Sequence, residues 1–145
     1  LYQSEKPFLV DFTLGATMML RYEVIQQTDM FDEAFFMYCE EVDWAWRIHQ
    51  AGWDVYCIPQ AHITHLSGKS TGQIRPQSQI NLWTSRFILF KRYLPTWQQV
   101  FIRWMVRIGM AKKIRQIQAD RALSPGQKTA LINAYQTIQN MAKSS

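Results

Sequence analysis

The amino-acid sequence changes character near residue 75, and this change limits the folds that the chain can adopt. Residues 1–54 carry ten acidic and three basic residues, whereas residues 55–145 carry thirteen basic residues and one acidic residue, Asp120. From Pro76 onward the sequence has helical periodicity, while the part before it alternates short apolar runs with turns and short helical segments. We therefore predict an α/β part with short mixed strands over residues 1–75 and a bundle of basic amphipathic helices over residues 76–145 that packs on it.

Local signals place the individual elements within these two parts. Strands are predicted over residues 8–12, 16–20 and 53–58, with another extended piece over residues 61–66. Helices are predicted over residues 21–28, 40–51, 77–94 and 96–118, and from Ser124 to Met141. The last helix has a good start signal, since Ser124 is a favoured N-cap and Pro125 suits the first helical position. Gly52 is the expected C-cap of the helix over residues 40–51.

The helix predicted over residues 40–51 gathers charged side chains at its beginning. On a 3.6-residue period, Glu40, Asp43, Trp44 and Arg47 share one face. Asp43 and Arg47 are four residues apart and can form an ion pair. Taken alone, this acidic first turn is typical of a solvated helix end, where the helix dipole stabilises carboxylates.

A longer ordered pattern of residues surrounds this helix. Its members are Gly15-Ala16, Met19-Leu20-Arg21, Phe31-Asp32-Glu33, Phe35-Phe36, Tyr38, Glu40-Glu41, Asp43, Trp46-Arg47, Ala51-Gly52-Trp53, Val55, Pro59, Ala61, His65 and Ser70. The set resembles the C-terminal half of family 2 glycosyltransferases, especially the rhamnosyltransferase-like branch, over about residues 10–72. The resemblance implies a GT-A-like fold and an inverting transfer of sugar from a nucleotide-sugar donor to a glycan or lipid-linked acceptor.

The resemblance also implies which residues do the chemistry. Inverting transfer needs a base that takes the proton from the attacking acceptor hydroxyl. In the resembling family this base is the second acid of a Glu-Asp pair, which corresponds here to Glu41. The chain therefore departs from the usual Asp, and the carboxylate sits one methylene further from the backbone. Glu40 and Asp43 stay open as alternative bases.

A divalent metal, Mg or Mn, is expected to neutralise the departing diphosphate. By resemblance, His65 completes the metal shell, although a lone His is more often structural. His62 falls on the opposite face of the extended piece and is interpreted as structural. No Asp-x-Asp motif occurs in this sequence. We therefore expect that motif and the nucleotide-binding strands to lie N-terminal to Leu1, so that most of the metal's ligands lie outside this chain.

Residues of the resembling pattern are also candidates for binding substrate. They are Gly15, Ala16, Trp46, Arg47, Lys69 and Ser70. Lys69 and Ser70 belong to a polar loop that by resemblance closes near the diphosphate, where a lysine can meet phosphate; a plain surface loop is the alternative. Trp44, Trp46 and Trp53 can include a sugar platform, although core packing is the expected role of at least two of them.

The basic helices leave two interpretations open. Residues 86–115 carry eight basic residues, no acid and many aromatic and aliphatic residues. This pattern suits the surface of an anionic membrane, and it equally suits helices that pack on the α/β part and expose their charges. Nucleic acid is not an expected partner, because no nucleic-acid-binding motif accompanies the charge.

Composition and cysteine content bear on where the protein works. No stretch of about 18 apolar residues predicts a membrane span. Two cysteines without a CxxC pair favour a reducing compartment. We expect a cytoplasmic enzyme, with a peripheral position at the inner face of the plasma membrane as one option. A non-catalytic module that binds a membrane or a partner through its basic helices is the alternative to an enzyme.

Overall fold

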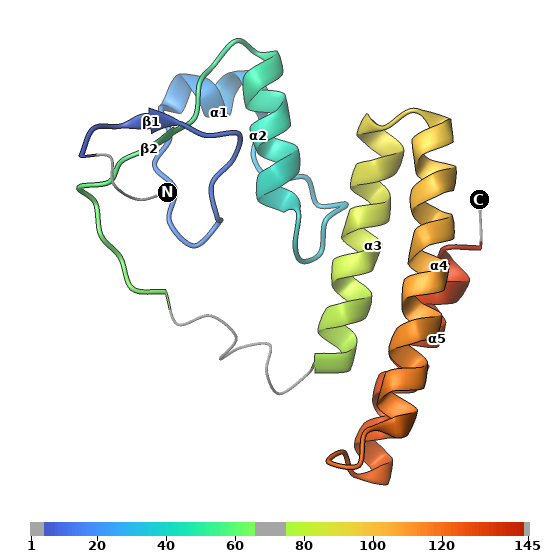
Figure 1. The fold of residues 1–145 in the computed structure, drawn as a ribbon. Coiled ribbons are helices and arrows are strands. Elements are labelled where there is room, and N and C mark those ends of the chain that lie inside the picture. Colours follow the sequence, from blue (N-terminus) through green and yellow to red (C-terminus); the bar gives the residue numbers. More distant parts are fainter. Residues whose placement is uncertain (1–4, 66–74, 144–145) are drawn as a thin grey trace. The chain divides into compact units, whose positions relative to one another are not determined.

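The computed structural model describes residues 5–65 and 75–143 of the chain. The chain divides into two compact units, Leu1–Ser67 and Gly68–Ser145, and each is described by itself (Figure 1). Within the described residues, the first unit contains a short sheet and two helices, and the second contains three helices. The helical periodicity that begins near residue 75 thus falls in a unit of its own.

The sheet of the first unit is antiparallel and has two short strands, β1 (Phe8–Leu9) and β2 (Tyr56–Cys57). Phe8 lies opposite Cys57, and Leu9 lies opposite Tyr56. The Val10 N–H donates to the Val55 carbonyl at 3.0 Å, so the pairing extends beyond the assigned strands. Both strands fall inside predicted ones, and side chains 53–58 alternate between half-buried and exposed as the sequence pattern predicts.

Two predicted extended segments are not strands. Residues 16–20 begin in a turn, where the Thr17 N–H donates to the Leu14 carbonyl, and Met19 is 99% exposed. Of the predicted piece over residues 61–66, residues 61–65 are described; they are exposed and irregular after a turn in which the Ala61 N–H donates to the Ile58 carbonyl. A strand needs a neighbour that completes its hydrogen bonds, and β1 and β2 supply none to either segment within the described residues.

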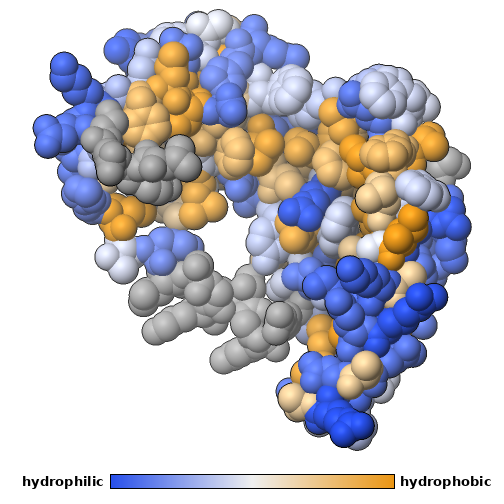
Figure 2. Space-filling model, in the orientation of Figure 1, coloured by the Kyte–Doolittle hydropathy of each residue, from blue (hydrophilic) through white to orange (hydrophobic). Residues whose placement is uncertain are grey.

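The two helices of this unit, α1 (Tyr22–Thr28) and α2 (Glu40–Gln50), match the predicted ones closely. Val24 of α1 and Trp44 and Ile48 of α2 form a small core. The half-buried apolar residues that pack against it come from the segment before α1, from α1 itself and from the segment after α2: Met18, Leu20, Ile25, Trp53 and Val55. The C-cap of α2 is Ala51 rather than the predicted Gly52. Gly52 is the next residue and has φ +84°, a left-handed conformation that glycine adopts without strain. Apolar residues also reach the surface of this unit (Figure 2).

The second unit is a bundle of three helices, α3 (Arg75–Tyr93), α4 (Thr96–Ala119) and α5 (Pro125–Met141). The start of α5 is as predicted. Ser124 accepts a hydrogen bond from the Gln127 backbone N–H, and the Gln127 side chain accepts one from the Ser124 N–H. This reciprocal cap satisfies two backbone donors that would otherwise lack partners.

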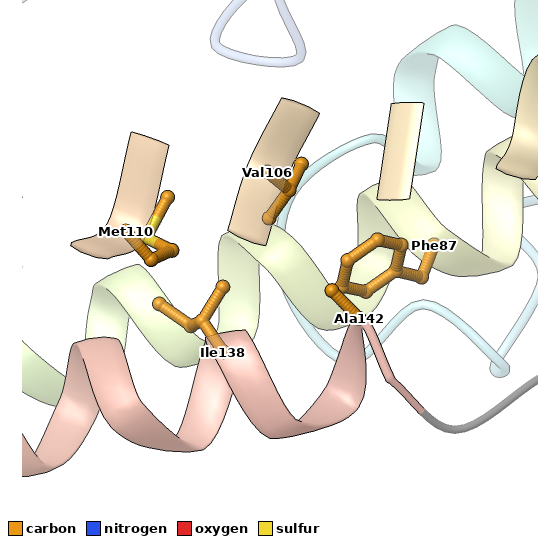
Figure 3. Packing of buried hydrophobic residues seen from close by; sticks show 5 residues of the cluster. All are labelled: Phe87, Val106, Met110, Ile138 and Ala142. Carbon is orange, nitrogen blue, oxygen red and sulfur yellow. The ribbon is translucent and has the colours of Figure 1, made fainter. Parts of the chain in front are cut away.

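The core of the helical unit lies where α5 packs against α3 and α4 (Figure 3). Ile138 is fully buried among Phe87, Val106, Met110 and Ala142. Arg103 links α4 to the end of α5 and to α3, since its Nη1 donates to the Met141 carbonyl at 2.9 Å and its guanidinium lies 4.9 Å from the centre of the Phe87 ring. The α4 residues that contact this core all come from one side of the helix.

Candidate active site

The N-terminal turn of α2 places two carboxylates, Glu40 and Glu41, side by side in sequence at the head of the helix. The chain enters this turn through Tyr38 and Cys39, whose φ angles are +71° and +67°. The left-handed conformation costs a residue other than glycine about 1–3 kcal/mol. The structure around the turn therefore has to hold these two residues in place.

Glu41 is a half-buried acid in this turn. Burial raises the pKa of its carboxyl, the backbone N–H of Glu41 itself lowers it, and the neighbouring charge of Glu40 raises it further. Gly15 lies against Glu41, because a Cβ atom placed on Gly15 would be 3.9 Å from the Cβ of Glu41. The fold thus brings together two parts of the resembling pattern that are 26 positions apart in the sequence.

Glu40 differs from Glu41 in its hydrogen bonding. Its Oε2 atom is buried and finds no hydrogen-bond partner among the described residues, and the same holds for the hydroxyl of Thr13. A buried polar atom without a hydrogen-bond partner is unusual in a folded protein, and a bound ligand or a functional role can account for it.

Asp43 and Arg47 form the ion pair that their spacing predicts. The Arg47 Nε donates to Asp43 Oδ2 at 3.0 Å, and the side chain of Asp43 is 0% exposed. The other guanidinium nitrogens of Arg47 donate to the Thr28 carbonyl and, at 2.8 Å, to the Met30 carbonyl. Arg47 therefore anchors α2 to the end of α1 and to the segment that follows it.

The three tryptophans of this unit lie in different surroundings. Trp44 is 3% exposed, and its indole N–H donates to the Thr28 hydroxyl at 2.9 Å. Trp53 is half-buried against the same core and donates to Gln27. Trp46 is 44% exposed. Of the three, Trp46 is therefore the one most exposed to solvent.

A groove of about 520 Å³ runs beside Trp46. Its lining residues are Asp11, Phe12, Val42, Trp46, His49 and Gln50. Its wall is mostly apolar, with a few polar groups, which is the usual character of a small-molecule site. The His49 imidazole links α2 to the segment after β1, since its Nε2 lies 2.9 Å from the Asp11 carbonyl oxygen; its Nδ1 lies 3.1 Å from the Trp53 carbonyl oxygen.

Of the residues that line this groove, sequence reasoning named only Trp46 as a site residue and missed Asp11, Phe12, Val42, His49 and Gln50. Val42, Trp46 and His49 are spaced four and three residues apart on α2, so their shared face was readable in the sequence. The pairing of that face with residues 11 and 12 was not readable, because it depends on where the chain after β1 runs.

The remaining predicted site residues are not gathered into this region by any contact. Ala16 is exposed in the turn after Gly15, and His65 is exposed. Lys69 and Ser70 lie outside the described residues. Among residues 5–65 and 75–143, no three His, Cys, Asp or Glu side chains cluster closely enough to hold a metal ion. The role of His65 as a metal ligand therefore stays a prediction.

Comparison with known proteins finds sequences that are similar to this chain. It is 31% identical over 108 residues to N-acetylglucosaminyl-diphospho-decaprenol L-rhamnosyltransferase of Mycobacterium tuberculosis, which covers 74% of this chain and 34% of that protein. It is 33% identical over 57 residues to rhamnosyltransferase WbbL of Escherichia coli, which covers 39% of this chain and 22% of that protein.

The chain spans about a third of the length of the mycobacterial relative it matches. No protein-family model matches it, and no solved structure matches it at a significant level. The mycobacterial alignment covers most of the chain, and the predicted resemblance to rhamnosyltransferases is confirmed. The chain is a rhamnosyltransferase-like glycosyltransferase sequence of the family 2 type.

Proposed function

We propose that this chain forms the acceptor-side part of an inverting glycosyltransferase with a GT-A-like fold. The observation that carries the proposal is the half-buried Glu41 at the head of α2, whose pKa is raised by burial and which packs against Gly15 of the same sequence pattern. A general base works best when its pKa approaches the working pH. Burial shifts Glu41 in that direction.

The proposed reaction is a single displacement. The acceptor hydroxyl oxygen attacks the anomeric carbon of the donor sugar, the bond from that carbon to the donor's diphosphate oxygen breaks, and the hydroxyl proton passes to the Glu41 carboxylate. Attack from the side opposite the leaving group inverts the configuration. Asp43 is fully buried and paired with Arg47, so we assign these two residues to positioning the α2 turn. Glu40 is the alternative base.

The names of the relatives suggest the substrates. We infer that the donor is a nucleotide-activated L-rhamnose and that the acceptor is an N-acetylglucosaminyl residue on a polyprenyl diphosphate, as the name of the mycobacterial relative states for that protein. His65 is proposed to provide one ligand of a divalent metal whose carboxylate ligands lie outside this chain. That metal, when bound, would neutralise charge on the departing diphosphate.

Incubating the full-length protein with radiolabelled nucleotide-rhamnose and the lipid-linked acceptor should give a labelled lipid-linked disaccharide. The product is separated by thin-layer chromatography, and its anomeric configuration is read by NMR. A product that retains the donor's configuration would contradict single displacement. No transfer with this or other nucleotide sugars, from a folded protein, would favour the non-catalytic alternative.

The groove beside Trp46 is proposed to hold a sugar ring of the acceptor, because the apolar face of a sugar can pack on an exposed indole. Replacing Trp46 with Ala should raise the KM for the acceptor about tenfold, since aromatic ring contacts contribute up to about 1.5 kcal/mol. The KM for the donor should stay unchanged. Trp46→Phe is the matched control and should keep most of the affinity. Equal changes in both KM values would contradict an acceptor-specific role.

A further inference from the structure

Helix α4 is apolar on two opposite sides, although only one of them contacts the rest of the bundle. Ile102, Val106 and Met110 face the core shared with α3 and α5. Another set lies on the other side and is 48–69% exposed, and we call it the outer stripe: Trp97, Val100, Phe101, Trp104, Met105 and Ile108. Their spacing of three, one, three, one and three residues keeps all six on one face of the helix.

The outer stripe is continuous and rich in aromatic side chains. From residue 97 to residue 108 it covers about 17 Å of helix length, at 1.5 Å per residue. The rings of Phe101 and Trp104 lie 6.2 Å apart, and Trp97 is 69% exposed. Single exposed apolar residues need no explanation, but a contiguous patch with three aromatic rings marks a surface that is normally covered.

The charges around the outer stripe show what kind of surface would cover it. Arg107 flanks the stripe, and Lys112 and Arg115 continue it toward the C-terminal end of α4; all three are exposed. No acidic residue occurs from residue 75 through residue 119. Hydrophilic residues gather toward the end of the unit where α4 leads into α5 (Figure 2). The face is therefore aromatic along one half and cationic along the other.

We propose that the outer stripe and its basic extension bind the surface of an anionic lipid bilayer, with α4 lying in the plane of the headgroups. Aromatic rings enter the boundary between headgroups and acyl chains, while arginine and lysine meet the lipid phosphates. None of the helices formed by the described residues has an apolar stretch long enough to cross a bilayer, so the arrangement is interfacial.

A second copy of the chain fits this face less well. A two-fold interface would pack the outer stripe of one copy against the outer stripe of the other. It would also bring the flanking cations of both copies close together, and α4 has no carboxylate that could offset their repulsion. An anionic bilayer covers the apolar half and neutralises the cationic half at once. The inference goes beyond the proposed enzymatic function and does not depend on it, because binding to vesicles is measured without any sugar transfer.

The apolar half of the face is tested by co-sedimentation of the full 145-residue chain with vesicles. We expect binding to phosphatidylcholine vesicles that contain phosphatidylglycerol, and at least about tenfold weaker binding by the variant W97S/F101S/W104S. The matched control replaces apolar residues of the first unit that are also exposed, Tyr22, Met30 and Phe36, with Ser, and should bind as the parent does. Circular dichroism should show both variants folded.

The cationic half is tested by the variant R107Q/K112Q/R115Q. Each basic residue near a charged bilayer contributes about fivefold to binding, so the three together should account for about 100-fold. K6Q/R21Q/K143Q removes the same net charge from exposed residues outside α4 and the turn that follows it, and should have a much smaller effect. Binding of the parent should weaken as salt rises.

Several results would overturn the proposal. Equal binding to neutral and anionic vesicles would show that the basic residues do not contribute to binding. Equal binding by the outer-stripe variant and its control would show that the outer stripe does not contact the bilayer. Absence of vesicle binding, combined with self-association in analytical ultracentrifugation that W97S/F101S/W104S abolishes, would assign the face to a second copy of the chain.

Discussion

Replacing Glu41 with Gln should lower the rate of sugar transfer by the full-length protein about 100-fold to 10,000-fold. This is the range that a positioned general base contributes to catalysis. Gln has nearly the same shape as Glu but cannot accept the hydroxyl proton, so substrate binding should change little and the loss should lie in kcat. Steady-state kinetics with a saturating acceptor measure this directly.

Two further variants make that result specific. Glu23→Gln removes the same charge from an exposed position in the first turn of α1 and should leave transfer unchanged. Glu41→Asp restores the residue that the resembling family usually carries and should keep a substantial part of the activity. Full activity in Glu41→Gln would move the role of base to Glu40. Loss of activity in Glu40→Gln with Glu41→Gln unaffected would establish that assignment.

The raised pKa of Glu41 sets the direction of two pH effects. The base must be ionised to accept a proton, so transfer should fall as pH drops through the raised pKa, at a higher pH than for an ordinary glutamate. A carboxyl whose pKa is raised by folding favours the folded state at low pH, and this contribution is lost as pH rises through the raised value. Glu41→Gln does not titrate, so it should gain stability relative to the parent as pH rises toward neutral.

The helices could be predicted from the sequence because their signals are local. The Ser124 cap, Gly52 after α2 and the spacing of Asp43 and Arg47 each act within a few residues, and the structure contains all three features. The strands are different, since a strand exists through a partner far away in the sequence. The apolar run over residues 16–20 has strand-like composition but no partner strand among the described residues, and it stays irregular.

The candidate site shows the same division between local and non-local information. Glu41, Trp46 and Arg47 lie on one helix and could be named from the sequence. The left-handed Tyr38 and Cys39 could not, because neither residue type favours that conformation. The groove depends on the contact between the His49 imidazole and the Asp11 carbonyl, two residues that are 38 positions apart. Such contacts follow from packing rather than from any motif.

The Asp43–Arg47 pair carries the largest expected effect on stability. Asp43→Asn keeps the shape of the side chain but leaves the Arg47 guanidinium without the carboxylate that its Nε contacts. Breaking a buried ion pair costs about 3–5 kcal/mol. Because the Arg47 side chain is 23% exposed and water can partly replace the lost partner, we expect the lower end, about 3 kcal/mol.

Hydrogen exchange with mass spectrometry measures this loss in the right place, because peptides from α1 and α2 report on the first unit separately from the helical unit. Exchange in both helices should accelerate, since Arg47 also holds the Thr28 and Met30 carbonyls, while peptides from α3–α5 should be unaffected. Asp54→Asn changes an exposed aspartate of the same unit and serves as the matched control. Unaltered exchange in α2 of Asp43→Asn would show that the pair does not hold the turn carrying Glu41, and the positioning role assigned to it would have to be abandoned.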